Sequence, residues 1–110
     1  MKSTTLKENK DFRRLYYRGK SEASSCLVTY VAKNNLGESR VGITSGKKIG
    51  NAVKRNRARR VIRAAFSRNE NKLKGNYDIV FVARTKTTIV KMQEVEKQMT
   101  MHLKNLGVID

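Results

Sequence analysis

The fold is decided by residues 47–68, which read KKIGNAVKRNRARRVIRAAFSR and contain nine basic side chains but no acidic one. Asn51 is a residue type that commonly caps helices, and the residues after it follow a helical period to about residue 69. At 100° per residue, the apolar side chains share an arc of roughly 140°. Most of the arginines fall on the opposite arc. The stretch therefore predicts an amphipathic helix that packs on the protein through Ala58, Val61, Ile62, Ala65 and Phe66.

The segments next to this helix predict strands. Residues 39–45 alternate between apolar and polar, and residues 77–83 are almost continuously apolar, as in a strand buried on both faces. Strand, helix and strand in this order predict a unit with parallel strands. Residues 25–33 predict another strand, which we expect to pair with residues 39–45 in an antiparallel hairpin. The arginines of the helix would then face solvent.

Helices are predicted towards both ends of the chain. Residues 8–18 form one, and the other carries a stripe of Val95, Met99, Leu103 and Leu106 and ends at Gly107. The 110 residues are the length of one domain. We therefore expect residues 1–110 to be a single domain, with residues 1–5 and 107–110 as flexible ends.

The composition narrows the functional class. The chain has 25 basic and nine acidic residues, a net charge of +16, and such an excess usually serves to bind a polyanion. No apolar run approaches the ~18 residues of a membrane span, and the polar N-terminus predicts no secretory signal. A lone Cys26 cannot form an internal disulfide. We therefore expect a cytoplasmic protein without membrane contact.

The residues for protein-borne catalysis are scarce. Glu94 and Glu96 are the one close carboxylate pair, and their spacing points them to different sides of a helix. His102 is the single histidine, and we expect it, like Cys26, to fill space in the interior. The sequence thus predicts no catalytic residue and no metal site. Two binding functions remain open, a structural RNA-binding protein of ribosomal type and a binder of duplex DNA.

The basic helix itself favours a phosphate partner. Arg59 has an arginine four residues before it and another four residues after it, and such like-charge pairs oppose helix formation by a few tenths of a kcal/mol. Phosphates would relieve this repulsion, and the planar guanidinium matches their oxygens in bidentate fashion. Asn51 and Asn56 add neutral donors and acceptors for sugars or base edges.

Aromatic residues form a second candidate site. Phe12 and Tyr16 are four residues apart and share one helix face, and Tyr30 lies in the middle of a predicted strand. Stacking on an unpaired base contributes about 1–3 kcal/mol, although the same rings could be ordinary core. Basic side chains surround the first helix and favour a groove that faces RNA: Lys10, Arg13, Arg14 and Arg18.

Residues 47–63 resemble the signature of the bacterial ribonuclease P protein subunit, with its Arg-Asn-Arg centre at Arg55, Asn56 and Arg57. The flanking segments agree over about residues 6–106. They are residues 11–20, residues 40–43 (RVGI) and residues 77–84 (YDIVFVAR). One departure lies at residues 44–46, where Thr-Ser-Gly stands in place of the family's usual Ser-Val-Ser.

The resemblance implies an α+β fold of order αβββαβα, with helices packed on a mixed four-stranded sheet similar to a ribosomal protein domain. It also implies a subunit of ribonuclease P that binds the catalytic RNA and the 5′ leader of precursor tRNA. This subunit assists endonucleolytic removal of the leader, and the catalytic centre is in the RNA. Mg²⁺ would be held mainly by that RNA and not tightly by the protein, which would be monomeric in isolation.

Two sets of residues follow from the resemblance. The leader-binding cleft maps to Phe12, Arg13, Tyr16, Tyr30 and Arg40. The surface for the catalytic RNA maps to Lys47, Lys48, Asn51, Lys54, Arg55, Asn56, Arg57, Arg59, Arg60 and Arg63. The alternative, a structural RNA-binding protein of ribosomal type, would need the second set and not the cleft.

Overall fold

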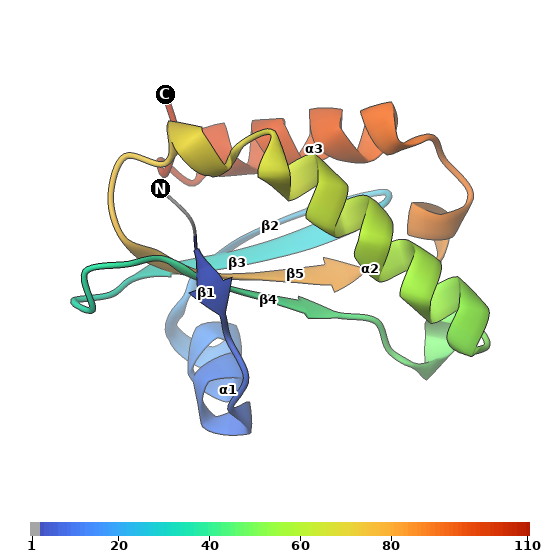
Figure 1. Cartoon of the computed structure of the whole chain (residues 1–110), viewed down its shortest axis with the longest axis horizontal. Coiled ribbons are helices and arrows are strands. Elements are labelled where there is room, and N and C mark those ends of the chain that lie inside the picture. The colour runs from blue at the N-terminus through green and yellow to red at the C-terminus, as the bar shows by residue number, and fades with distance from the viewer. Residues whose placement is uncertain (1–2) are drawn as a thin grey trace.

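The computed structural model describes residues 3–110. It has three α-helices and five strands, joined by short 3₁₀ turns (Figure 1). In chain order the elements are β1 (Thr4–Thr5), α1 (Asn9–Arg18), β2 (Lys20–Ser24), β3 (Leu27–Lys33), β4 (Arg40–Thr44), η1 (Lys47–Ile49), α2 (Ala52–Ser67), η2 (Glu70–Lys72), β5 (Tyr77–Ala83), η3 (Thr85–Thr88) and α3 (Met92–Asn105).

The strands form one mixed sheet in the order β1-β4-β5-β3-β2. β4 and β5 are adjacent and parallel, which confirms the strand–helix–strand prediction. β5 is buried along almost its whole length, as its apolar sequence predicts. Four strands make up most of the sheet, and the two-residue β1 adds a fifth by pairing in parallel with β4.

The predicted antiparallel hairpin between β3 and β4 is wrong. β5 lies between these strands and pairs antiparallel with β3 and parallel with β4. The partner of β3 on its other edge is β2, a polar strand that the strand periodicity did not indicate. The residues that link β3 to β4 do turn, with Gly37 at a φ of 80°, but turn residues alone do not specify which strand the chain pairs with next.

The helices lie on opposite faces of the sheet. α2 and α3 cover one face and α1 lies against the other (Figure 1). The main core, which includes Ile79 and Phe81 of β5, lies under α2 and α3. A smaller cluster on the α1 side contains Leu15 and Val80, with Tyr30 packed partly against it. The face under α1 is therefore the less completely filled one.

Both chain ends contact the rest of the protein. Ser3 donates hydrogen bonds from its backbone N and its Oγ to Oε2 of Glu70, each at 2.6 Å. Val108 and Ile109 are buried, and the backbone N of Lys74 donates to the carbonyl of Val108 at 2.9 Å. The flexibility expected over residues 3–5 and 107–110 stays a prediction, and residues 1–2 lie outside the described part.

A buried carboxylate joins α1 to the sheet. Asp78 of β5 is 1% exposed and accepts from Arg40 Nη2 at 2.6 Å, Arg14 Nη2 at 2.9 Å and Asn34 Nδ2 at 2.9 Å. Asp11 of α1 lies 3.3 Å from Arg14 and 3.4 Å from Arg40. Burial alone would raise the pKa of Asp78, but the hydrogen bonds of Arg40 and Asn34 and the charges of both arginines together hold that pKa below its ordinary value.

We expect Asp78→Asn to lower the free energy of unfolding by about 3 kcal/mol at pH 7, because it leaves Arg40 partly buried without its carboxylate. A carboxyl whose pKa is lowered by folding stabilises the protein above its unfolded pKa of about 4, and that stability is lost as the pH falls through the folded pKa. Denaturant unfolding at pH 7 and pH 3 should therefore show that the free energy of unfolding falls less between these pH values in the variant than in the unaltered protein.

Asp110→Asn is the matched control, because Asp110 is 93% exposed and its ion pair with Lys74 lies at the surface. Its stability should stay near that of the unaltered chain. An equal change in the two variants would contradict the importance assigned to Asp78.

Candidate nucleic-acid interface

α2 has the amphipathic design that the sequence predicts. The side chain of Asn51 caps it, with Oδ1 accepting from the backbone N of Lys54 at 3.0 Å. Four of the five predicted apolar positions are buried, and Val61 is half-buried. The predicted docking of one side of this helix on the sheet and α3 is therefore confirmed.

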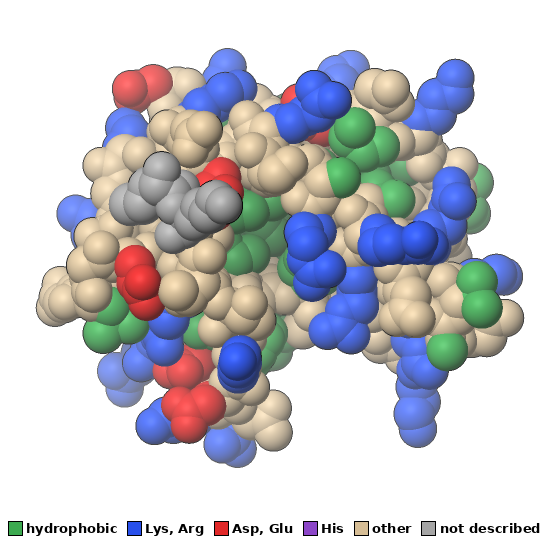
Figure 2. All heavy atoms as spheres, viewed as in Figure 1, with side chains coloured by type: hydrophobic (Ala, Val, Ile, Leu, Met, Phe, Trp, Pro, Cys, Tyr) green, Lys and Arg blue, Asp and Glu red, His purple; other side chains and the backbone are tan. Residues whose placement is uncertain are grey.

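The other side of α2 presents an arginine ridge, by which we mean Arg57, Arg59, Arg60 and Arg63, all exposed. Within residues 3–110 none of these side chains forms an ion pair. Arg59 donates one long hydrogen bond, 3.5 Å, to the carbonyl of Ile43. Figure 2 shows basic side chains gathered over α2. The ridge is therefore available to an external anion.

The remaining predicted residues of the signature lie around the start of α2. Lys47 and Lys48 are exposed on η1, directly before the helix. Lys54 and Asn56 are exposed in its first turns, whereas Arg55 is half-buried. The structure thus brings most of the set onto one continuous surface, with Asn51 serving the helix as its cap.

The three predicted aromatic residues meet on the α1 side of the sheet. The ring centroids of Phe12 and Tyr16 are 6.5 Å apart, and those of Tyr16 and Tyr30 are 4.9 Å apart in an edge-to-face arrangement. Tyr16 is 43% exposed, and the other two rings are half-buried. The rings therefore pack on the core and still present surface, and base stacking on them stays a prediction.

Gly42 makes room for this cluster. A Cβ at Gly42 of β4 would lie 2.6 Å from Cζ of Phe12, well inside contact distance. The ring of Phe12 can therefore rest directly on the backbone of β4. The family-like RVGI segment thus places an aromatic ring against the edge of the sheet.

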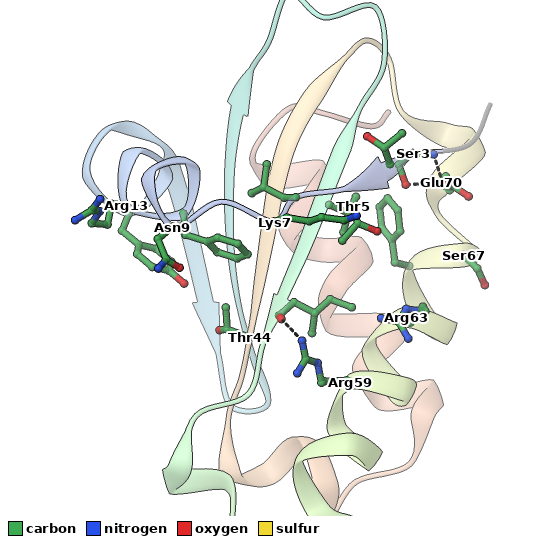
Figure 3. A pocket seen from close by; sticks show the side chains of 17 residues that line it. Ser3, Thr5, Lys7, Asn9, Arg13, Thr44, Arg59, Arg63, Ser67 and Glu70 are labelled. Carbon is green, nitrogen blue, oxygen red and sulfur yellow. Dashed lines mark hydrogen bonds between the residues drawn. The ribbon is translucent and has the colours of Figure 1, made fainter. Parts of the chain in front are cut away.

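The aromatic side of the sheet and the arginine ridge open onto one groove of about 910 Å³. Figure 3 shows Asn9 of α1 on one side of it, Arg59 and Arg63 of α2 on the other, and Thr44 of β4 between them. Phe12, Arg13 and Tyr16 also line it. Parts of two sites that are separate in the sequence therefore line one groove.

Several lining residues were not predicted as site residues, among them the polar side chains of Lys7, Asn9 and Thr44. Lys7 lies in the irregular segment between β1 and α1, where no helical or strand period applies. The other two lie at an element end, and their position at the groove depends on how α1 and β4 meet. No local sequence signal marks such residues.

Arg40, which the resemblance assigns to the cleft, is not among the residues that line the groove. Its side chain is 21% exposed and is held by Asp78 and Asp11. The hydrogen bond to Asp78 is the main reason that the pKa of Arg40 is raised, against the opposing effect of burial. Its guanidinium therefore ties β4 and α1 together, whereas Arg13 is exposed and lines the groove.

The other titratable candidates are interior residues, as expected. His102 is fully buried, its Nδ1 lies 2.9 Å from Oγ1 of Thr29, and burial lowers its pKa. Burial likewise raises the pKa of the Cys26 thiol. In the described part of the chain, no group of three or more His, Cys, Asp and Glu side chains is placed to hold a metal ion. No helix there is long and apolar enough to cross a membrane.

This arrangement can bind nucleic acid in two ways. The arginine ridge offers planar donors to phosphate oxygens. The aromatic rings offer faces and edges to unpaired bases. A groove that combines both suits a single strand, because a duplex keeps its bases stacked on one another.

Comparisons with known proteins identify the family of this chain. The family model described as Ribonuclease P matches residues 1–107. A ribonuclease P protein component from Clostridium novyi is 44% identical over 109 residues, covering 97% of this chain and 96% of that protein. One from Clostridioides difficile is 44% identical over 102 residues, covering 92% of this chain and 86% of that protein.

Solved structures show the same fold. The Staphylococcus aureus RNase P protein aligns with a TM-score of 0.86 at 32% identity, covering 99% of this chain and all of the other. The Thermotoga maritima RNase P protein aligns with a TM-score of 0.77 at 30% identity, covering 88% and 92% of the two chains. The chain therefore belongs to the ribonuclease P protein family, as an RNA-binding subunit of the endoribonuclease that processes tRNA.

Proposed function

We propose that this subunit holds two RNAs at once, the catalytic RNA on the arginine ridge and η1, and the 5′ leader of precursor tRNA in the adjoining groove. The observation that carries the proposal is the shared groove, which Phe12 and Tyr16 line on one side and Arg59 and Arg63 on the other. A leader seated there would lie beside the RNA that cleaves it.

The charge of the chain explains how it would assist. Precursor tRNA and catalytic RNA are both polyanions and repel each other. Phosphate neutralisation by the +16 protein releases counterions and lowers the salt and Mg²⁺ needed for their association. Mature tRNA has no leader, so a grip on the leader would favour precursor over product.

The chemistry belongs, in this proposal, to the RNA. A water molecule activated by Mg²⁺ hydrolyses the phosphodiester, and RNA phosphates hold most of the metal. The buried carboxylates of Asp11 and Asp78 support this division, because arginines already bind them. The protein would act as a monomer in the cytoplasm, where a bacterial cell makes its tRNA.

Reconstitution tests the proposal directly. Adding this protein to a bacterial ribonuclease P RNA at low Mg²⁺ should raise the rate at which precursor tRNA is cleaved, because the protein supplies charge that Mg²⁺ otherwise provides. The assay follows release of the leader on a gel. A protein that binds the RNA without raising cleavage would instead fit the structural, ribosomal-type alternative.

We expect the double variant Arg57→Ala/Arg60→Ala to bind the catalytic RNA about tenfold more weakly per lost arginine–phosphate contact. The slope of log K against log [salt] should also fall, by about 0.9 per contact for a helical RNA region. Filter binding over a salt series measures both quantities. The control Lys97→Ala/Lys104→Ala removes the same charge from exposed positions on α3 and should have the smaller effect. Equal effects of the two double variants would contradict the binding of the catalytic RNA on the arginine ridge.

Tyr30 does not itself line the groove, but its ring packs against that of Tyr16, which does. We expect Tyr30→Ala, which removes this support, to weaken binding of precursor tRNA to the holoenzyme by about tenfold, within the range for one lost base–aromatic contact, and to leave mature tRNA unaffected. Tyr30→Phe keeps the ring and should behave like the unaltered protein. Competition binding with both tRNA forms, together with a melting curve for each variant, gives the comparison. Equal losses for precursor and mature tRNA would rule out the leader groove.

A further inference from the structure

The outward side of α1 carries a second cationic surface. At 100° per residue, its basic side chains and Tyr17 occupy a continuous arc of about 140°. We call the exposed members that are not paired with a buried carboxylate the α1 surface: Lys10, Arg13, Tyr17 and Arg18. The apolar side of the helix points elsewhere, because Leu15 is buried and Tyr16 lies against Tyr30.

Tyr17 is the unusual member of this surface. Its side chain is 92% exposed, more than twice the exposure of Tyr16 beside it. Within residues 3–110 it contacts no other aromatic ring, and its hydroxyl forms no hydrogen bond with a side chain. The fold therefore makes no visible use of a large ring that sits in the middle of basic side chains.

The charges around Tyr17 are largely available. Arg13 and Arg18 form no ion pair in the described part of the chain. Lys10 lies 3.7 Å from Glu8 in a highly exposed pair, which contributes little. Asp11 is buried, and Arg14 is bound to it and to Asp78. The surface is thus positive, with one exposed carboxylate at its border.

The position of the α1 surface separates it from the arginine ridge. α1 and α2 lie on opposite faces of the sheet (Figure 1). Arg13 alone belongs to both the α1 surface and the groove. An RNA segment seated on α2 therefore cannot cover Tyr17 and Arg18 at the same time without running through the groove and over α1.

We infer that the α1 surface is a second RNA-binding surface, on which Lys10, Arg13 and Arg18 bind phosphates and Tyr17 stacks on an unpaired base. The inference rests on the proposed function, since it assigns a further contact to the same RNA-binding subunit. A surface that served solubility alone would mix charges of both signs and would not expose an aromatic ring. RNA matches both features, because its phosphates pair with the basic side chains and an unpaired base stacks on the exposed ring.

The 5′ leader is the RNA that the position of this surface favours. Leader nucleotides that leave the groove at Arg13, which belongs to both surfaces, reach the α1 surface next. The test uses Tyr17→Ala, Tyr17→Phe and Lys10→Ala/Arg18→Ala, with Leu36→Ala as the control at another exposed apolar side chain, 58% exposed in the link between β3 and β4.

The first arm measures binding of each variant to the catalytic RNA alone, and the second measures binding of precursor tRNAs with stepwise longer leaders to the holoenzyme. In the second arm Tyr17→Ala should weaken binding of precursors with long leaders about fivefold or more, and the first arm should be unchanged. Tyr17→Phe and Leu36→Ala should stay within about twofold of the unaltered protein, since one keeps the stacking ring and the other lies elsewhere. Lys10→Ala/Arg18→Ala should flatten the salt dependence by about 0.7 per phosphate of a single strand.

A loss that appears only with long leaders supports the leader as the ligand, whereas a loss in the first arm would assign the surface to the catalytic RNA and overturn the inference. Unchanged affinity of Tyr17→Ala in both arms would overturn the inference, as would equal losses for Tyr17→Ala and Tyr17→Phe. Cleavage assays with the unaltered protein test the proposed function separately. Its stimulation of cleavage does not depend on what the Tyr17 variants bind. Melting curves for all variants exclude unfolding as the cause of a loss.

Discussion

The packing of α2 on the sheet is the contact on which the rest of the molecule depends. Ala58, Ile62 and Ala65 are completely buried, and this burial holds the helix in one rotation about its axis. The arginines on its other side have no acidic partners within the described chain and repel one another. Apolar burial must therefore offset a repulsion that only an external polyanion relieves. The free protein keeps its binding surface open for that reason.

The groove depends on a second constraint, the attachment of α1 to the opposite face. The apolar cluster there is small, with Leu6, Leu15 and Val80 as its buried members. Asp78 and its arginines add a polar connection between α1, β4 and β5, and Gly42 lets the ring of Phe12 approach the backbone of β4 closely. Packing on one face thus orients the ridge, whereas ion pairs on the other face hold the aromatic side of the groove.

The limits of the sequence analysis follow from the range of each interaction. The cap at Asn51, the two sides of α2 and the parallel β4–β5 pair depend on local periodicity, and the structure confirms them. The pairing of β3 depends on which strand occupies the centre of the sheet, and β5 lies more than 40 residues further along the chain. The role of Arg40 depends on Asp78, 38 residues away. The family resemblance located the ridge and the aromatic residues, but only coordinates could join them in one groove.

The two faces of the molecule can bind RNA independently. Electrostatic interactions at physiological salt decay over about 8 Å, and the molecule measures 36 × 28 × 22 Å. Phosphates on α2 therefore hardly alter the potential at Tyr17, which lies across the sheet. Contacts on the two faces should add in free energy when nothing else connects them. Any cooperation between RNAs on α1 and α2 must then be transmitted by the RNA strand in the groove or by the rigid sheet, because charge alone does not reach that far.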